Sequence, residues 1–200
     1  MTTMPRRMAT GAAIIVIAVG GLGLSGPAAA APTDHTVSVL GATGSGCDGD
    51  VAAAVKGSSI DVRYGSLAAR APAGQRTTAE CMASLKIKPR AGYGYRVSSG
   101  SQQWWSHQPD GAKSRAVYHL AHRGSLGTID ALDFDGAADG HGVLHWFEMD
   151  KNLHGCEQPA PPLDLAYSLT VSASSSPALL SLSPGDGAWS HLNVEFVRCA

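Results

Sequence analysis

The stretch LDLAYSLTV, residues 163–171, alternates large apolar side chains with small or polar ones without interruption. A period of two places alternate side chains on opposite sides of an extended strand. One side of this stretch would carry only apolar groups, namely Leu163, Leu165, Tyr167, Leu169 and Val171. The stretch therefore predicts a strand that buries one face in a core and turns the other towards solvent.

The same period recurs along most of the chain, and turn-forming Gly, Pro, Asp and Ser residues separate the segments that carry it. Many short strands at this spacing favour an all-β fold, which we expect to be a single-domain β-sandwich, Ig-like or jelly-roll-like. Short helical pieces are expected at most, around 50–56 and 77–82. The further strands are expected at 59–64, 84–88, 93–97, 116–120, 128–134, 143–149 and 192–197.

The first thirty residues have the pattern of a secretory signal peptide. Arg6 and Arg7 form a positive region, residues 9–24 are apolar, and Ala28, Ala29 and Ala30 supply the small residues of a cleavage site. We therefore expect residues 1–30 to be removed and residues 31–200 to form a secreted, extracellular β-sandwich domain.

Charge and hydropathy exclude two classes of partner. The whole chain has a formal net charge of −1, and loss of Arg6 and Arg7 with the signal peptide makes it more acidic. A nucleic-acid partner would require a clustered basic face, which the sequence does not show. No second apolar run is long enough to span a bilayer, so no membrane contact is expected after signal cleavage.

Four cysteines remain in the exported domain: Cys47, Cys81, Cys156 and Cys199. An even number in an exported chain argues for two disulfides, and four cysteines allow three pairings. We favour Cys47–Cys81 with Cys156–Cys199, because each bridge then closes a loop of moderate length and the second ties down the end of the chain.

The segment GSGCDG, residues 44–49, matches the glycine fingerprint of a dinucleotide-binding turn. That motif requires a long helix after the glycines, and only a short segment precedes the next strand here. Thr43 stands where a nucleophile elbow would need its first glycine. We interpret the segment as a tight turn in which Gly44, Gly46 and Gly49 bring Cys47 close to its partner.

Acidic and imidazole side chains gather between 130 and 145. Asp133, Asp135 and Asp139 are oxygen ligands of the kind that calcium prefers, although the order of an EF-hand loop is absent. His141 and His145 would share one face of a strand, where imidazoles can bind zinc. The competing interpretation is a solvated acidic hairpin followed by surface histidines.

Aromatic residues offer a candidate binding surface. Trp104, Trp105 and Trp146 could form a platform of the type that sugar-binding modules use. Because neighbours on a strand face opposite ways, at most one of Trp104 and Trp105 should face the core. The alternative is that these indoles only pack the core. No spacing selects a catalytic residue, since a triad is defined by geometry and not by sequence position.

Several motifs along the chain resemble one known family, and the order and spacing of the four cysteines strengthen the likeness. The motifs are 44–47 with Gly49 and Val51, Cys81 followed by 85–89, Gly92-Tyr93, 118–120, 134–136, Cys156 ahead of 163–171, and 192–196 before Arg198-Cys199. The resemblance is to the small secreted proteins of the domain-of-unknown-function 4360 family, in whose G-S-G-C-P-x-G motif Asp48 here replaces the proline. It implies export and a mostly β fold, and it implies no activity.

The sequence thus favours a non-enzymatic extracellular or cell-surface binding protein, with cell-wall or extracellular polysaccharide as the expected partner. One alternative is a secreted hydrolase, metal-dependent through the 130–145 region. A structural or inhibitor-like protein is the other.

Overall fold

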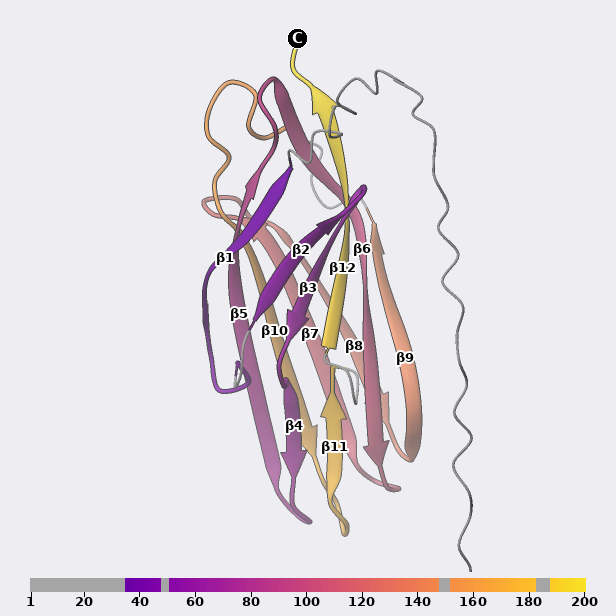
Figure 1. Ribbon diagram of the computed structural model, residues 1–200. Coiled ribbons are helices and arrows are strands. Elements are labelled where there is room, and N and C mark those ends of the chain that lie inside the picture. The colour runs from indigo at the N-terminus through magenta and orange to yellow at the C-terminus, as the bar shows by residue number, and fades with distance from the viewer. Residues whose placement is uncertain (1–34, 48–50, 148–151, 183–187) are drawn as a thin grey trace, which may run out of the picture. The chain divides into compact units, whose positions relative to one another are not determined.

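The computed structural model describes residues 35–47, 51–147, 152–182 and 188–200, and within these ranges every regular element is a strand (Figure 1). The expected signal peptide lies outside the described residues. Nor do these ranges hold a helix of the length and apolarity that a membrane crossing requires. The strands are β1 (Thr36–Thr43), β2 (Ala52–Lys56), β3 (Ser59–Tyr64), β4 (Ala68–Ala71), β5 (Arg76–Lys88), β6 (Tyr93–Gln108), β7 (Lys113–His122), β8 (Thr128–Asp135), β9 (Ala138–Phe147), β10 (Leu163–Ser172), β11 (Ala178–Ser181) and β12 (Ala188–Arg198).

The strands form two antiparallel sheets that pack face to face, so the expected β-sandwich is confirmed (Figure 1). The five-stranded sheet has the order β1-β5-β10-β7-β8. In the seven-stranded sheet, β6 is long enough to pair with β9 along one edge and with both β12 and β11 along the other. Strands β3 and β4 continue this sheet beyond β12 and β11, and β2 pairs with β3.

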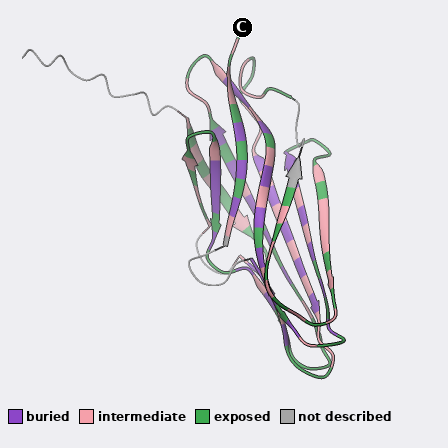
Figure 2. Cartoon of the chain, turned by 90° about the vertical axis from the view of Figure 1, so that its right-hand side faces the viewer, coloured by how far each residue is buried: buried purple, intermediate pink, exposed green. Residues whose placement is uncertain are grey.

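Strand β10 is the expected strand at 163–171, and its alternation is complete. All ten of its residues pair with β5 on one edge and with β7 on the other. Its five apolar side chains are buried, while the side chains between them are only partly covered. Figure 2 shows the same alternation of buried and exposed positions along neighbouring strands.

A polar connection crosses the core between the sheets. The hydroxyl of Tyr167 on β10 lies 2.7 Å from Oγ of Ser190 on β12, and Ser190 donates to the side-chain carbonyl of Gln102 on β6. Burial raises the pKa of Tyr167, so its hydroxyl stays protonated and can donate. All three side chains are buried, and each has a hydrogen-bond partner among the other two.

Both segments expected to be helical are strands, so that prediction was wrong. Strand β2 falls inside 50–56 and pairs with β3 through the turn Gly57-Ser58, where Gly57 has a φ of 61°. Five residues are too few to overcome the cost of nucleating a helix, whatever the propensity of alanine. The segment 77–82 lies within β5, whose alternating burial continues to Lys88.

Both disulfides have the pairing favoured from the sequence, Cys47–Cys81 and Cys156–Cys199. The turn before Cys47 needs its glycines, as expected. Gly44 has a φ of 130°, and a Cβ on it would lie 2.2 Å from the carbonyl oxygen of Glu80. The amide of Gly46 donates to that same oxygen at 2.7 Å. The turn therefore lies directly against β5, next to Cys81.

Replacing Cys47 and Cys81 together with serine should lower the free energy of unfolding by about 2–5 kcal/mol, because the bridge restricts the unfolded chain. Denaturant unfolding of the exported domain measures this loss. Peptide mapping without reduction should join Cys47 to Cys81, and a peptide that joins Cys47 to Cys199 would contradict the assignment.

Candidate functional site

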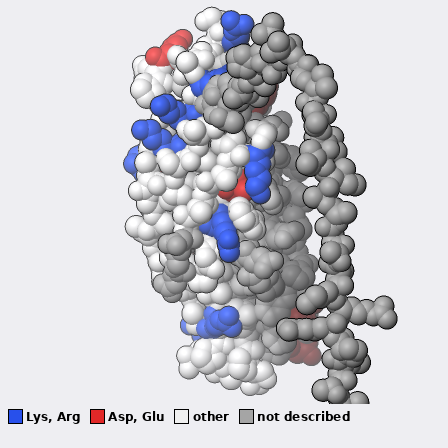
Figure 3. Space-filling view, viewed as in Figure 1, with Lys and Arg blue, Asp and Glu red and all other residues white. Residues whose placement is uncertain are grey.

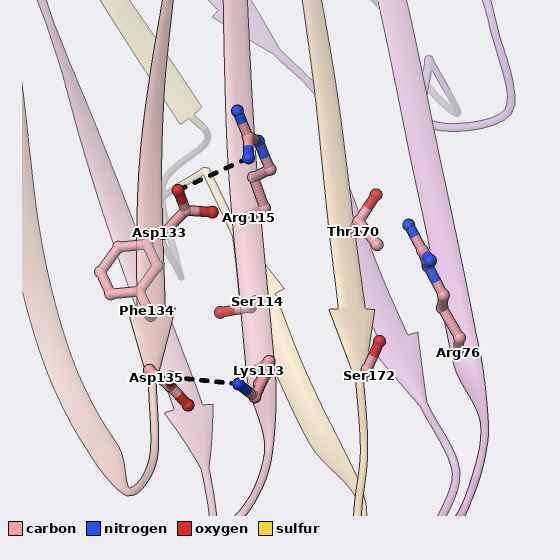
Figure 4. A pocket seen from close by; sticks show the side chains of 9 residues that line it. All are labelled: Arg76, Lys113, Ser114, Arg115, Asp133, Phe134, Asp135, Thr170 and Ser172. Carbon is pink, nitrogen blue, oxygen red and sulfur yellow. Dashed lines mark hydrogen bonds and ion pairs between the residues drawn. The ribbon is translucent and has the colours of Figure 1, made fainter.

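The acidic residues proposed as metal ligands do not form a cluster. Asp133 and Asp135 lie on the outer face of the five-stranded sheet, and both are exposed. Asp133 pairs with Arg115 at 3.6 Å and Asp135 with Lys113 at 3.2 Å (Figure 4). Each carboxylate is therefore neutralised by a cation on the neighbouring strand β7.

The other three candidates belong to the opposite sheet. Asp139, His141 and His145 are exposed on β9, and Asp139 lies 3.4 Å from Nδ1 of His107. His141 and His145 share a face, but four strand positions separate their Cα atoms by about 13 Å. Across the described ranges, no group of three His, Cys, Asp or Glu side chains is arranged to hold a metal ion.

The solvated acidic hairpin considered for this segment is not formed. Strand β8 ends at Asp135 and pairs with β7, whereas β9 begins at Ala138 and pairs with β6 in the other sheet. Gly136, with a φ of 80°, lies where the chain crosses between the sheets. This crossing separates the acidic candidates from the histidines.

Trp104 and Trp105 point in opposite directions, as the alternation predicted. Trp104 is fully buried in the core. Trp105 is half-buried on the outer face of the seven-stranded sheet. The backbone of Trp146 pairs with Gly100, but the side chain of Trp146 lies outside the described residues.

A second indole joins Trp105 on this outer face, and the sequence analysis missed it. Ser190 lies opposite Gln102, which places Trp189 of β12 beside Gln103, two positions along β6 from Trp105. Trp189 is also half-buried. We call the surface formed by Gln103, Trp105, His107 and Trp189 the indole face. The period of two that places Leu192 in the core also places Ser190 there and Trp189 on the outer face. The strand expected from the sequence began only at Leu192, so Trp189 was left out of it.

The rings of the indole face are held by their neighbours. The rings of Trp105 and His107 are nearly parallel, 10° apart, with centroids separated by 6.0 Å. Lys56 Nζ and the guanidinium of Arg63 lie 5.0 and 5.9 Å from the ring centroid of Trp189. Both cations come from strands on the side of β12 away from β6, so they support Trp189 without separating it from Trp105.

A buried carboxylate fixes the position of Lys56. Asp61 is 3% exposed, and its oxygens lie 2.6 Å from both Lys56 Nζ and His191 Nδ1. Burial acts to raise the pKa of Asp61, but the hydrogen bonds from Lys56 and His191 outweigh it, and the net effect lowers that pKa. Asp61 therefore remains a carboxylate and holds Lys56 close to Trp189.

Charged side chains flank the indole face: Lys56 and Arg63 lie beside Trp189, and Asp139 lies beside His107. Figure 3, which views the molecule from the side of the seven-stranded sheet, shows acidic and basic groups scattered among a larger uncharged area of the described surface. Flat apolar rings beside an amide and a few fixed charges provide stacking and hydrogen bonding. This arrangement is suited to holding a ligand.

Comparison with known proteins gives a fold likeness only. No family model and no curated protein matches the sequence. Among solved structures, a carbohydrate-binding module in complex with β-1,4-galactotriose is similar over 83% of this chain and 89% of its own, at 8% identity and a TM-score of 0.30.

Two further structures are similar at the same level. The enzymatically active domain of tailspike protein 4 of bacteriophage CBA120 is 11% identical at a TM-score of 0.29, over 83% of this chain and 19% of its own. A family 11 carbohydrate-binding module from Clostridium thermocellum, in complex with a mixed-linked tetrasaccharide, is 8% identical at a TM-score of 0.25, over 80% and 88%. TM-scores this low carry no argument about the ligand.

The substitution Asp61→Asn should destabilise the protein at neutral pH by about 1.5–3 kcal/mol, the range for hydrogen bonds to a charged group. Because folding lowers the pKa of Asp61 from its ordinary value of 3.8, the unfolded chain takes up the proton first as the pH falls. The contribution of Asp61 is thus present above about pH 4 and is lost below it. Denaturant unfolding of the variant across this range should show a shallower loss of stability in acid.

The matched control is Asp133→Asn, which removes an exposed carboxylate of the opposite sheet. It should change the free energy of unfolding by no more than about 0.5 kcal/mol. Equal effects of the two substitutions would contradict a special role for Asp61.

Proposed function

We propose that this chain is a non-enzymatic extracellular protein that binds a polysaccharide on its indole face. One observation carries the proposal. Strands β6 and β12, which are far apart in the sequence, bring Trp105 and Trp189 to one outer face, with Gln103 beside them.

The chemistry of the indole face suits a sugar chain. A sugar ring has faces lined by C–H groups and a rim of hydroxyls, so it needs flat apolar surfaces and hydrogen-bonding groups together. Trp105 and Trp189 supply large rigid surfaces that lose little conformational entropy on binding. The amide of Gln103 can both donate to and accept from hydroxyls.

The indole face is also long enough to hold more than one sugar unit. From His107 to Gln103, which lies beside Trp189, the strand advances four residues, or about 13 Å. The parallel rings of His107 and Trp105 continue the stacking surface along β6. A ligand with repeated rings could therefore contact Trp105 and Trp189 at once.

Two further observations bear on the extracellular location and on the hydrolase alternative. Disulfides persist in oxidising compartments, and both bridges fit the export predicted from residues 1–30.

The hydrolase alternative needs Asp133, Asp135, His141 and His145 in one pocket. These residues lie on the outer faces of opposite sheets, so we do not propose that activity.

The test is retention of the exported domain on a panel of insoluble polysaccharides and cell-wall material. We expect retention on at least one of them. On that material, Trp105→Ala and Trp189→Ala should each weaken binding about tenfold or more, because buried aromatic anchors carry most of the energy of an interface.

The control is Leu126→Ala, which removes a side chain that is 96% exposed on a different part of the surface. This variant should bind like the unchanged chain. Retention on none of the materials, or unchanged binding of both tryptophan variants, would contradict the proposal.

A further inference from the structure

We propose a second binding site on the opposite sheet, which takes the carboxylate or phosphate group of an acidic polymer. The site is a groove along β10, on the outer face of the five-stranded sheet. It uses none of the residues of the indole face, so this inference does not rest on the proposed function.

The groove follows from the sizes of the side chains on three neighbouring strands. The outward residues of β10 are short along most of its length, and those on β5 and β7 are mostly longer. Strand β10 is therefore the floor, and β5 and β7 are the walls. The short residues are Ala166, Ser168, Thr170 and Ser172, and the walls include Arg76, Glu80 and Met82 on β5 with Lys113, Arg115 and His119 on β7.

Two hollows open along this floor. One has a volume of about 330 Å³ and is lined by Arg76, Ser172 and Lys113 among others. The other has a volume of about 390 Å³ and is lined by Met82, Ala166 and His119 among others. From Ser172 to Ala166 the floor runs about 20 Å, which suits an extended chain better than a single ion.

The first hollow has more cations than acids. Arg115 and Lys113 are paired with Asp133 and Asp135, but Arg76 makes no ion pair with any residue in the described part of the chain. In Figure 4, Arg76 stands on β5, across β10 from Lys113 and Arg115, with the hydroxyls of Thr170 and Ser172 between them. A guanidinium beside two hydroxyls is thus left available in a hollow with a net positive charge.

This arrangement matches a carboxylate or a phosphate. A guanidinium binds the oxygens of either group through two parallel hydrogen bonds and stays charged across the physiological pH range. The hydroxyls of Thr170 and Ser172 can donate to the same anion. Thr170 is already positioned by a hydrogen bond of 3.0 Å to the hydroxyl of Thr78.

The ion pairs of the opposite wall can adjust to such a ligand. Lys113 and Asp135 have side chains that are 70% and 73% exposed, and exposed pairs contribute little to stability. Lys113 can therefore turn towards a bound anion at little cost. The second hollow then receives the next units of the polymer, with Met82, Val117 and Ala166 for apolar contact. The carboxylate of Glu80, to which Ser168 donates, accepts hydrogen bonds only and can therefore bind the hydroxyls of these units but not their acid groups.

Affinity measurements with three soluble polymers test the site on the exported domain: polygalacturonate for carboxylates, poly(glycerol phosphate) for phosphates, and neutral dextran. We expect at least one acidic polymer to bind, more weakly as salt is raised, and dextran not to bind in the groove. The substitution Arg76→Gln should weaken acidic-polymer binding at least fivefold, and Arg76→Lys should weaken it less. The acidic polymer that binds identifies the acid that the groove takes.

Two controls separate this site from general charge and from the indole face. Arg70→Gln removes one exposed positive charge from β4 of the other sheet and should leave acidic-polymer binding unchanged. Trp105→Ala should also leave it unchanged. Failure of both acidic polymers to bind, an equal loss in the Arg70 and Arg76 variants, or loss in the Trp105 variant would each overturn the proposal.

Discussion

Strand β10 is hydrogen-bonded to a neighbour along the whole of both its edges, and the rest of the sandwich depends on this double pairing. A shift of one residue would exchange its buried Leu, Tyr and Val side chains with Asp, Ser and Thr. The register is therefore fixed by burial. Once it is fixed, Tyr167 faces Ser190 across the core and positions β12 of the other sheet. The same register makes the outward side of β10 a row of short residues, so the core and the β10 groove have a common origin.

The sequence predicted what local chemistry controls and missed what distant pairing controls. Alternation identified β10, and the glycines before Cys47 indicated the turn that seats a disulfide. The alanine-rich segment of β2 misled the prediction because its conformation is set by pairing with β3 and not by its own propensity. The turn at Gly136 resembles a hairpin locally, and only the partners of β8 and β9 show that the chain changes sheets there.

In the candidate binding surfaces, too, local patterns could be predicted and distant strand pairings could not. Alternation alone predicted that Trp104 and Trp105 face opposite ways, and it correctly left one indole outside the core. The position of Trp189 on the same outer face as Trp105 could not be predicted, because it requires that β12 lie beside β6 in a known register. The histidines and aspartates looked like one cluster because they are close in the sequence. A strand spreads such residues along its length, and a sheet crossing places them on different faces.

A β-sandwich restricts where a binding site can form, because every second side chain of its strands packs in the core. Only outward positions remain, and they form two surfaces with the packed core between them. The indole face and the β10 groove share no residue and draw on different sheets, so we expect occupation of one to leave the affinity of the other nearly unchanged. Two independent sites on opposite faces would let one molecule hold two polymer chains together. Where both chains belong to the same matrix, attachment at one site raises the effective concentration for the other, and retention then exceeds what either site gives alone.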